Sequence, residues 1–264
     1  MNAPFGRQMQ IDLGKKQMKS DSERWVLVTG GSRGIGRGIV EALVNQYRVV
    51  FTYRQESQQA ASLVQSLSDK GAAVEAHRCD GVDPLQVNTL AKECLARLGA
   101  PWGLIQNAGV TQDGAFVNMT DQVWRHVLST NLDSCFYTVR AFLEPMLAER
   151  RGSVVMMSSI TAIHGNPGQV NYAATKAAML GMTRSLSREV ARYRVRVNAI
   201  APGLINTEMV AAMPDERRRA MEKCVPLRRL GRVDEVGALV RYLLSDASEY
   251  MTGQTLVLDG GLSA

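Results

Sequence analysis

Tyr172 and Lys176 are four residues apart, and Ser159 precedes Tyr172 by 13 residues. Side chains at positions i and i+4 of a helix project from one face, so this phenol and this ammonium group can reach the same small volume. A phenol has a pKa of about 10, but a nearby cation favours its ionised form. We therefore predict that Tyr172 is a general acid whose pKa is lowered by Lys176.

A glycine-rich segment with the sequence T-G-G-S-R-G-I-G occupies residues 29–36. Glycine tolerates positive φ angles and lets the backbone approach a ligand, so the segment predicts a tight turn that presents a helix N-terminus to a pyrophosphate. Its spacing is G-x-x-x-G-x-G rather than G-x-G-x-x-G, and alone it is equally typical of an ordinary glycine turn. The residues predicted to contact a dinucleotide here are Thr29, Gly30, Ser32, Arg33, Gly34, Ile35 and Gly36.

The order of the motifs carries more weight than any one of them. The glycine segment is followed by N-A-G at residues 107–109, then by Ser159, and then by Tyr172 and Lys176. A lone Tyr-x-x-x-Lys is usually a surface pair on an amphipathic helix, but agreement among several signals favours a shared function. Together the motifs predict an enzyme that transfers a hydride with the help of a dinucleotide cofactor.

The second predicted strand ends without a carboxylate, which bears on the choice of cofactor. A site that prefers NAD usually places a carboxylate there, roughly 20 residues after the glycine segment, to bind the ribose 2′-hydroxyl. This chain has F-T-Y-R at residues 51–54. Because Arg33 and Arg54 can donate charge-assisted hydrogen bonds to a 2′-phosphate, we predict NADP(H) over NAD(H). Asp80, after the third strand, is predicted to bind the adenine amino group, with a loop cap as the alternative.

Short apolar segments alternate with longer helical patterns along the chain. This alternation predicts an α/β fold, a Rossmann-type doubly wound seven-stranded parallel sheet with helices on both faces. Strands are expected at 25–29, 48–53, 74–79, 104–107, 154–158, 196–200 and 255–258. Helices are expected near 35–46, 56–70, 84–98, 121–149, 171–192, 206–223 and 232–245. Ligands of such sheets bind at the carboxyl ends of the strands, where the candidate residues fall, so we expect one cleft to collect them.

The length and composition fit one large domain. The chain has 264 residues, of which 45% are hydrophobic, enough for a substantial core. We expect residues 24–264 to form a single NADP-binding domain, and residues 1–23, which are polar and lack apolar periodicity, to be an extension of it. No segment approaches the roughly 18 to 20 apolar residues of a membrane helix, and the N-terminus lacks the apolar centre of a signal peptide. We therefore expect a cytoplasmic protein without membrane contact.

The charged, cysteine and histidine residues exclude several kinds of site. The net charge is +6, but the arginines are dispersed and no aromatic-interleaved basic stripe indicates nucleic acid. The four cysteines are scattered and the three histidines lack ligand spacing, so neither a disulfide framework nor a metal is expected. One group of arginines either attracts an acidic carrier protein or an acyl-CoA, or forms an ordinary solvated face: Arg150, Arg151, Arg192, Arg194 and Arg196.

From Trp25 to the C-terminus, the sequence resembles the classical short-chain dehydrogenases/reductases. The shared motifs are the glycine segment, N-A-G, Asn131, Ser159, Tyr172 with Lys176, and P-G-L-I-N-T at 202–207. Within the family, residues 166–176, residues 195–203 and the terminal T-G-Q-T-L-V-L-D-G-G are most similar to bacterial β-ketoacyl-[acyl carrier protein] reductases.

The resemblance implies a role for each motif residue. Tyr172 would donate a proton to the substrate carbonyl oxygen, Ser159 would hold that oxygen, and Lys176 would bind the nicotinamide ribose. Asn131 would support a water-linked proton relay, with a buried structural amide as the alternative. Residues 208–225 would form a substrate lid. The implied cofactor contacts are Asn107, Ala108, Gly109, Tyr172, Lys176, Pro202, Gly203, Ile205 and Thr207.

Several departures from the carrier-protein reductases keep alternatives open. Arg150 matches a basic docking residue, but a second docking arginine is Tyr193 here and an arginine after N-A-G is Gln112. The leading hypothesis is NADPH-dependent reduction of a 3-oxoacyl thioester on acyl carrier protein, in fatty acid or polyketide/polyene-type biosynthesis. The alternatives are an NADP-dependent ketone reductase or alcohol dehydrogenase acting on acyl-CoA or a free small molecule, and a non-catalytic dinucleotide-binding scaffold. The resemblance also implies a homotetramer, with a dimer left open.

Overall fold

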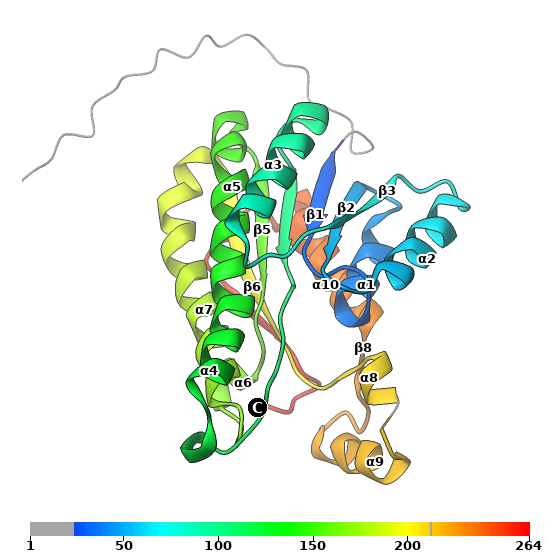
Figure 1. Ribbon diagram of the computed structural model, residues 1–264, viewed down its shortest axis with the longest axis vertical. Helices are drawn as coiled ribbons and strands as arrows, with labels where there is room; N and C mark the ends of the chain where they lie inside the picture. Colours follow the sequence, from blue (N-terminus) through cyan, green and yellow to red (C-terminus); the bar gives the residue numbers. More distant parts are fainter. Residues whose placement is uncertain (1–23, 212) are drawn as a thin grey trace, which may run out of the picture.

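The computed structural model describes residues 24–211 and 213–264 (Figure 1). Seven strands form one parallel sheet in the order β3-β2-β1-β4-β5-β6-β9. Their bounds are β1 (Trp25–Val28), β2 (Arg48–Tyr53), β3 (Val74–Arg78), β4 (Gly103–Gln106), β5 (Gly152–Met157), β6 (Val195–Pro202) and β9 (Thr255–Leu258). Every residue of β1, β4 and β5 is buried, as expected for a parallel sheet covered on both faces. The predicted Rossmann-type fold is confirmed.

Helices cover both faces of the sheet, which forms the middle layer (Figure 1). The helices on one face are α1 (Gly34–Leu43), α2 (Ser57–Ser68) and α10 (Val233–Leu244), and those on the other are α3 (Pro84–Leu98), α5 (Ser134–Glu149) and α7 (Val170–Val190). The strand order reverses at β1, which has β2 on one side and β4 on the other. In such sheets the ligand cleft forms at this switch point, outside the carboxyl ends of the strands.

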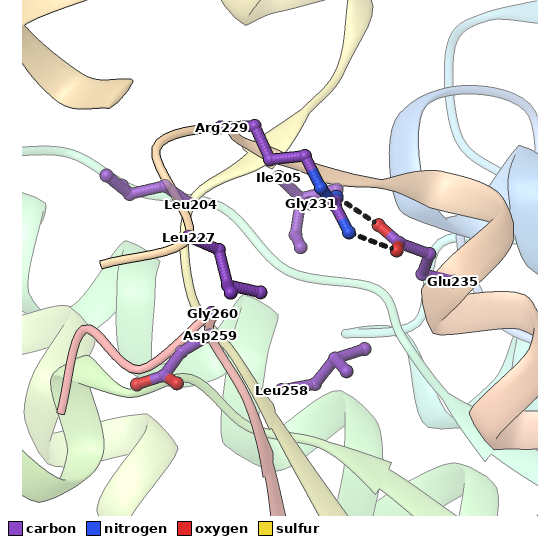
Figure 2. A pocket seen from close by; sticks show the side chains of 9 residues that line it. All are labelled: Leu204, Ile205, Leu227, Arg229, Gly231, Glu235, Leu258, Asp259 and Gly260. Atoms are coloured by element: carbon purple, nitrogen blue, oxygen red, sulfur yellow. Dashed lines mark hydrogen bonds and ion pairs between the residues drawn. The ribbon is translucent and has the colours of Figure 1, made fainter. Parts of the chain in front are cut away.

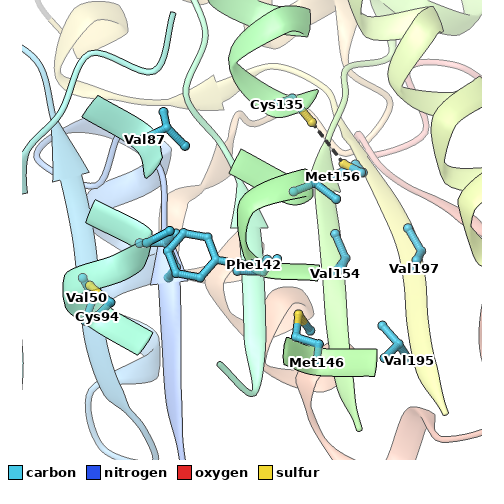
Figure 3. Close-up of a cluster of buried hydrophobic side chains, with 14 of the residues drawn as sticks. Val50, Val87, Cys94, Cys135, Phe142, Met146, Val154, Met156, Val195 and Val197 are labelled. Carbon is cyan, nitrogen blue, oxygen red and sulfur yellow. Dashed lines mark hydrogen bonds between the residues drawn. The ribbon is translucent and has the colours of Figure 1, made fainter. Parts of the chain in front are cut away.

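A buried apolar core on the α5 and α7 side fixes these helices against the sheet (Figure 3). Phe142 of α5 is fully buried, and its ring meets that of Trp25 edge to face, with centroids 6.0 Å apart. The Sγ of Cys135 lies 3.5 Å from the Sδ of Met156 on β5. Close packing of this kind leaves little room for rotation, so the helix that carries Tyr172 has a rigid support.

The segment at 121–149 is not one regular α-helix, as predicted, but two α-helices joined by a π turn. α4 (Asp121–Leu128) is followed by the π-helical turn η3 (Ser129–Asp133) and then by α5. π turns inside helices are rare and occur frequently at functional sites. Asn131 lies within the turn, so the departure from regular geometry coincides with a candidate site residue.

The predicted helix at 206–223 is wrong. The segment contains the strand β7 (Ile205–Asn206) and two short helices, α8 (Glu208–Ala211) and α9 (Asp215–Cys224), and β7 pairs in parallel with β8 (Gly231–Arg232). Pro214 is the N-cap of α9. A proline disfavours helical geometry in the residue before it, which explains why one continuous helix does not form here.

The other predicted elements are present, with ends that differ by a few residues. The remaining short helices are α6 (Thr161–His164), η2 (Phe116–Asn118), η4 (Ala191–Tyr193) and η5 (Asp246–Ser248). None of the helices within residues 24–211 and 213–264 has the length and apolar character needed to cross a membrane. The predicted N-terminal extension, residues 1–23, lies outside the described residues.

Candidate active site

The glycine segment forms a tight turn between β1 and α1. Gly30 and Gly34 have φ angles of 66° and 54°, in the left-handed region that favours glycine. Gly36 is fixed by lack of space instead, because a Cβ atom there would overlap the carbonyl oxygen of Gly30 and lie 2.6 Å from Nδ2 of Asn107. The turn leads directly into α1, whose first backbone N–H groups can bind an anion.

The N-A-G segment after β4 holds this turn in place. The Oγ1 of Thr29 accepts hydrogen bonds from the backbone N–H groups of Asn107 and Ala108, both at 3.0 Å. The side-chain amide of Asn107 donates to the carbonyl oxygens of Thr29 and Gly30, also at 3.0 Å. These bonds cross the switch point between β1 and β4, so the predicted cofactor residues of both segments lie together.

Ser159 and Tyr172 meet beyond the carboxyl end of β5. The Oγ of Ser158 donates to the carbonyl oxygen of Lys176 at 2.8 Å, which joins the end of the strand to α7. Tyr172 is in the first turn of α7, and the Ser159 side chain lies near its phenol oxygen, where it favours the phenolate. The Oγ of Ser159 also accepts a hydrogen bond from the N–H of Thr161 at 3.1 Å. The predicted pair of hydroxyl donors is therefore assembled in the folded chain.

Lys176 is buried behind Tyr172, with only 3% of its surface exposed. Its Nζ donates a hydrogen bond to the carbonyl oxygen of Met157 at 2.7 Å and lies 5.6 Å from the centre of the Tyr172 ring. Burial lowers the pKa of the ammonium group to about 8, because the charged form loses its hydration. A Cβ atom on Gly109 would lie 3.4 Å from Nζ, so the N-A-G segment borders this group.

Asn131 is fully buried, and its side-chain amide makes three hydrogen bonds. Its Oδ1 accepts a hydrogen bond from the N–H of Val110 at 2.7 Å, and its Nδ2 donates to the carbonyl oxygen of Val110 and to Oγ1 of Thr175. These bonds tie the π turn to the segment after N-A-G and to α7. The structural role is thus present, and both N–H donors of the Asn131 amide are used within the fold.

The chain matches, over residues 30–263, the model of a family described as Enoyl-(Acyl carrier protein) reductase. It is 38% identical over 237 residues to the 3-oxoacyl-[acyl-carrier-protein] reductase FabG of Staphylococcus aureus, across 89% of this chain and 96% of that protein. FabG of Chlamydia pneumoniae is 38% identical over 242 residues, across 90% of this chain and 96% of that protein. The chain belongs to the short-chain dehydrogenase/reductase family.

The short-chain dehydrogenase/reductase family uses a nicotinamide dinucleotide, and the residues of this chain fit one. The turn at Gly30 and Gly34 leads into the N-terminus of α1, where backbone N–H groups can bind a diphosphate. Among the described residues, only Met157 gives the buried ammonium of Lys176 an oxygen acceptor. An ammonium group has three N–H donors, so ribose hydroxyls would satisfy the ones that remain.

The predicted lowering of the Tyr172 pKa is not observed. The pKa of Tyr172 is raised rather than lowered, first because burial disfavours the phenolate and then because the negative charge of Asp113 lies nearby. The nearby Ser159 side chain acts in the opposite direction but is outweighed. The spacing of Tyr172 and Lys176 did not reveal how strongly the phenol is buried.

The end of the cleft near β2 contains a carboxylate that the sequence analysis missed. Glu56, just beyond the F-T-Y-R segment, lies 3.4 Å from the Nη2 of Arg33. Arg54 accepts a hydrogen bond at its carbonyl oxygen from Nε of Arg78. Asp80 accepts a hydrogen bond from the N–H of Val82 at 3.2 Å, which is the loop cap considered as the alternative. The sequence does contain a signal for this carboxylate, because Glu56 follows Arg54 by only two residues.

The P-G-L-I-N-T segment runs from the end of β6 over the carboxyl edge of the sheet. Its Gly203 N–H donates to the carbonyl oxygen of Leu258 at 2.9 Å, and Pro202 accepts from the N–H of Ile160 at 3.0 Å. Figure 2 shows the small cavity beside this segment, lined by Leu204, Ile205, Leu227 and Leu258 and closed by the ion pair of Arg229 with Glu235, whose hydrogen bonds measure 2.7 and 2.8 Å. This packing holds the segment that carries Ile205 and Thr207.

The predicted basic group is smaller than expected. Arg196 is not part of an exposed face, because its guanidinium donates to Oγ of Ser248 at 3.0 Å and to the carbonyl oxygen of Ser245 at 3.4 Å. Arg150 and Arg192 do lie together, since the Arg150 guanidinium donates to the carbonyl oxygen of Arg192 at 3.0 Å. The Arg192 guanidinium in turn donates to the Tyr193 hydroxyl at 2.9 Å.

Proposed function

We propose that the chain uses NADPH to reduce a 3-oxoacyl thioester on acyl carrier protein to the 3-hydroxyacyl thioester, in fatty acid or polyketide-type synthesis. The observation that carries this proposal is the neighbouring pair of Ser159 and Tyr172 beside the buried Lys176, at the edge of the sheet where the glycine turn also lies. The named reductases of Staphylococcus aureus, Staphylococcus epidermidis and Chlamydia pneumoniae support the substrate class. A non-catalytic scaffold has no need for this set of side chains.

Reduction of a ketone adds a hydride to the carbonyl carbon and a proton to the oxygen. The hydride would come from a reduced nicotinamide bound at this edge of the sheet. Tyr172 gives its phenol proton to the oxygen, and its raised pKa keeps the proton on the phenol until the oxygen becomes basic. Ser159 donates a hydrogen bond to the same oxygen, so two hydroxyl groups stabilise the alkoxide charge as it forms.

Lys176 assists after the proton has left Tyr172. Its ammonium lies near the phenol ring and favours the phenolate, which limits the cost of ionising a buried group. After the reaction, a water molecule must return a proton to Tyr172. Because the N–H donors of the Asn131 amide are already bonded, we place this water between Lys176 and the backbone of the π turn. Lys176 and the π turn therefore return the acid to its protonated form for the next turnover.

We assign NADPH as the preferred cofactor because of Arg33 and Arg54, and the assignment predicts a selective loss. Replacing both arginines by alanine should raise the KM for NADPH by roughly 10- to 100-fold, which corresponds to about 1.4 to 2.8 kcal/mol in total. This is less than the sum of two hydrogen bonds to a charged group, which contribute about 1.5 to 3 kcal/mol each, because the Arg33 side chain is 56% exposed and already pairs with Glu56. The KM for NADH should change by less than about twofold, because NADH has no 2′-phosphate. Steady-state kinetics with both cofactors measures the difference.

The matched control removes two other arginines. Arg48 and Arg97 both pair with Glu75 at the edge of the sheet near β3, and the Arg48→Ala/Arg97→Ala variant loses the same charge without touching the glycine turn. This variant should keep the preference of the original chain. An unchanged ratio of the two KM values in the Arg33→Ala/Arg54→Ala variant would remove the basis for assigning NADPH.

The experiment that tests the substrate follows NADPH oxidation with 3-oxoacyl groups presented in parallel on acyl carrier protein, on CoA and on a short thioester mimic, with NADH as the cofactor control. A large advantage for the carrier, which weakens as salt is added, supports docking through the basic residues around Arg150 and Arg192. Equal activity on CoA or on free ketones would identify a general ketoreductase. No activity on any of them would favour the scaffold.

We propose further that the enzyme is a homotetramer. Figure 1 shows α5 and α7 side by side at one edge of the molecule, and Phe136 of α5 and Val170 of α7 are 45% and 42% exposed. Burying these side chains against another copy removes apolar surface from water. Light scattering measures the mass directly, and a value for two subunits would favour the dimer instead.

We propose the cytoplasm as its compartment. Cys79, Cys94 and Cys135 are buried free thiols, and Cys224 is an exposed one. Thiols persist in a reducing compartment, where disulfides are rare. Fractionation of cells that express the full chain tests this assignment, and recovery outside the cytoplasm would contradict it.

A further inference from the structure

The N-terminus of α1 is bonded to a carboxylate from a distant part of the chain. The helix has Arg33 as its N-cap residue, without a side-chain capping bond, and no acidic residue in its first turn. The N–H of Gly34 instead donates to Oε2 of Glu208 at 3.4 Å, across 174 positions of sequence. The Oε1 of Glu208 lies 4.0 Å from Nη1 of Arg37, one turn further along α1.

The position of Glu208 follows from the start of the predicted lid. Glu208 is the first residue of α8, directly after Thr207 of the P-G-L-I-N-T segment. A Cβ atom on Gly34 would lie 3.7 Å from Cγ2 of Thr207, so this segment passes close to the turn. A negative charge is favoured at a helix N-terminus, because the unpaired N–H groups and the helix dipole both attract it.

The same N–H groups are those that a dinucleotide diphosphate binds when it lies at the start of a helix after a glycine turn. A carboxylate and a phosphate cannot both occupy this place, since they compete for the donors and repel each other. We infer that Glu208 takes the place of a cofactor phosphate in the free enzyme, so that cofactor binding must displace it and release the start of the lid. This inference rests on the proposed nicotinamide dinucleotide site.

The contact of Glu208 with the N-terminus of α1 is weak enough for a diphosphate to displace it. The Gly34 to Glu208 bond is long, and the side chain of Glu208 is 61% exposed, so water competes for it. Arg37 also pairs with Glu41 at 2.9 Å and keeps that partner when Glu208 leaves. A diphosphate, which brings two charges and several acceptor oxygens, therefore displaces Glu208 at a small cost. The coupling is reciprocal: an interaction that stabilises α8 in this position weakens cofactor binding by the same factor by which bound cofactor weakens that interaction.

The test is direct binding of NADP⁺ to the full chain and to the Glu208→Gln variant, measured by titration calorimetry. The variant loses the competing charge, so it should bind NADP⁺ roughly two- to fivefold more tightly, the range expected for a carboxylate at a helix N-terminus. Adenosine 2′-phosphate, which has no diphosphate, should bind both proteins equally. Glu216→Gln, an exposed residue of α9, removes one charge from the same segment and should leave the affinity for NADP⁺ unchanged.

The outcomes separate the inference from the function on which it rests. If NADP⁺ binds the unaltered chain but Glu208→Gln binds it equally or more weakly, Glu208 does not compete and the inference is overturned. If Glu216→Gln tightens binding as much as Glu208→Gln, the effect is one of overall charge and the inference also fails. If neither NADP⁺ nor NAD⁺ binds the unaltered chain, the proposed dinucleotide function itself is wrong. Hydrogen exchange at α8 gives a second readout, because it should rise when NADP⁺ is added to the unaltered chain and should change less in Glu208→Gln.

Discussion

The Tyr172→Phe variant should lose about 10²- to 10⁴-fold in kcat, the usual contribution of a positioned general acid. Tyr172 is the group that we propose as the proton donor beside Ser159, and phenylalanine preserves the ring against its neighbours. The KM for the substrate and the affinity for NADPH should change little, because the lost interaction matters mainly in the transition state. NADPH oxidation with a short 3-oxoacyl thioester measures the loss.

The control is Tyr250→Phe, which removes a phenol hydroxyl from a fully exposed side chain. Its turnover should equal that of the original protein. If Tyr172→Phe keeps its turnover with a substrate that the original enzyme reduces, the acid lies elsewhere. An increase in the KM for NADPH without a change in kcat would instead assign Tyr172 to cofactor binding alone.

Gly36→Ala should destabilise the fold by about 3 kcal/mol, at the upper end of the cost of forcing extra volume into a packed site. The added Cβ would overlap the carbonyl oxygen of Gly30 and press on the amide of Asn107, and both atoms belong to the bonded junction between β1 and β4. The turn can accept a methyl group only by opening, so NADPH binding should be lost as well. Denaturant unfolding and calorimetric titration measure the two effects.

Gly181→Ala is the matched substitution. Gly181 lies within α7, and a Cβ atom there would meet nothing within 4 Å in the chain. Alanine is favoured over glycine inside a helix, so this variant should be as stable as the original protein or up to about 1 kcal/mol more stable. Equal stability of Gly36→Ala and the original protein would mean that the turn has more freedom than its contacts indicate.

The architecture and the proximity of the candidate residues could be predicted because their signals are local. Apolar segments such as residues 25–28 and 152–157 indicate buried strands, and the glycine-rich segment indicates the turn, in which Gly30 and Gly34 have positive φ angles. Parallel strands also place the residues that follow them at one edge, so Ser159 and Asn107 were predicted to lie in one cleft. These inferences need only the pattern and the handedness of the fold.

The other features of the site depend on contacts between residues that are distant in the sequence, and a local sequence pattern does not reveal such contacts. The π turn at Asn131 depends on bonds to Val110 and Thr175, and Glu208 meets Gly34 across most of the chain. Burial likewise decided the pKa of Tyr172, against the expectation from its spacing with Lys176. The predicted helix at 206–223 failed for a local reason that was visible, since Pro214 interrupts it.

The sheet separates two apolar cores, one under α1 and α10 and the other under α5 and α7. The first supports the helix that faces the dinucleotide, and the second supports the helix that carries Tyr172 and Lys176. The two clusters consist of different buried residues, so the free-energy effects of substitutions that lie far apart in them should add. During evolution, substitutions in the core under α5 and α7 can therefore change which ketones such an enzyme reduces. The core under α1 and α10, and with it the binding of the coenzyme, can stay the same.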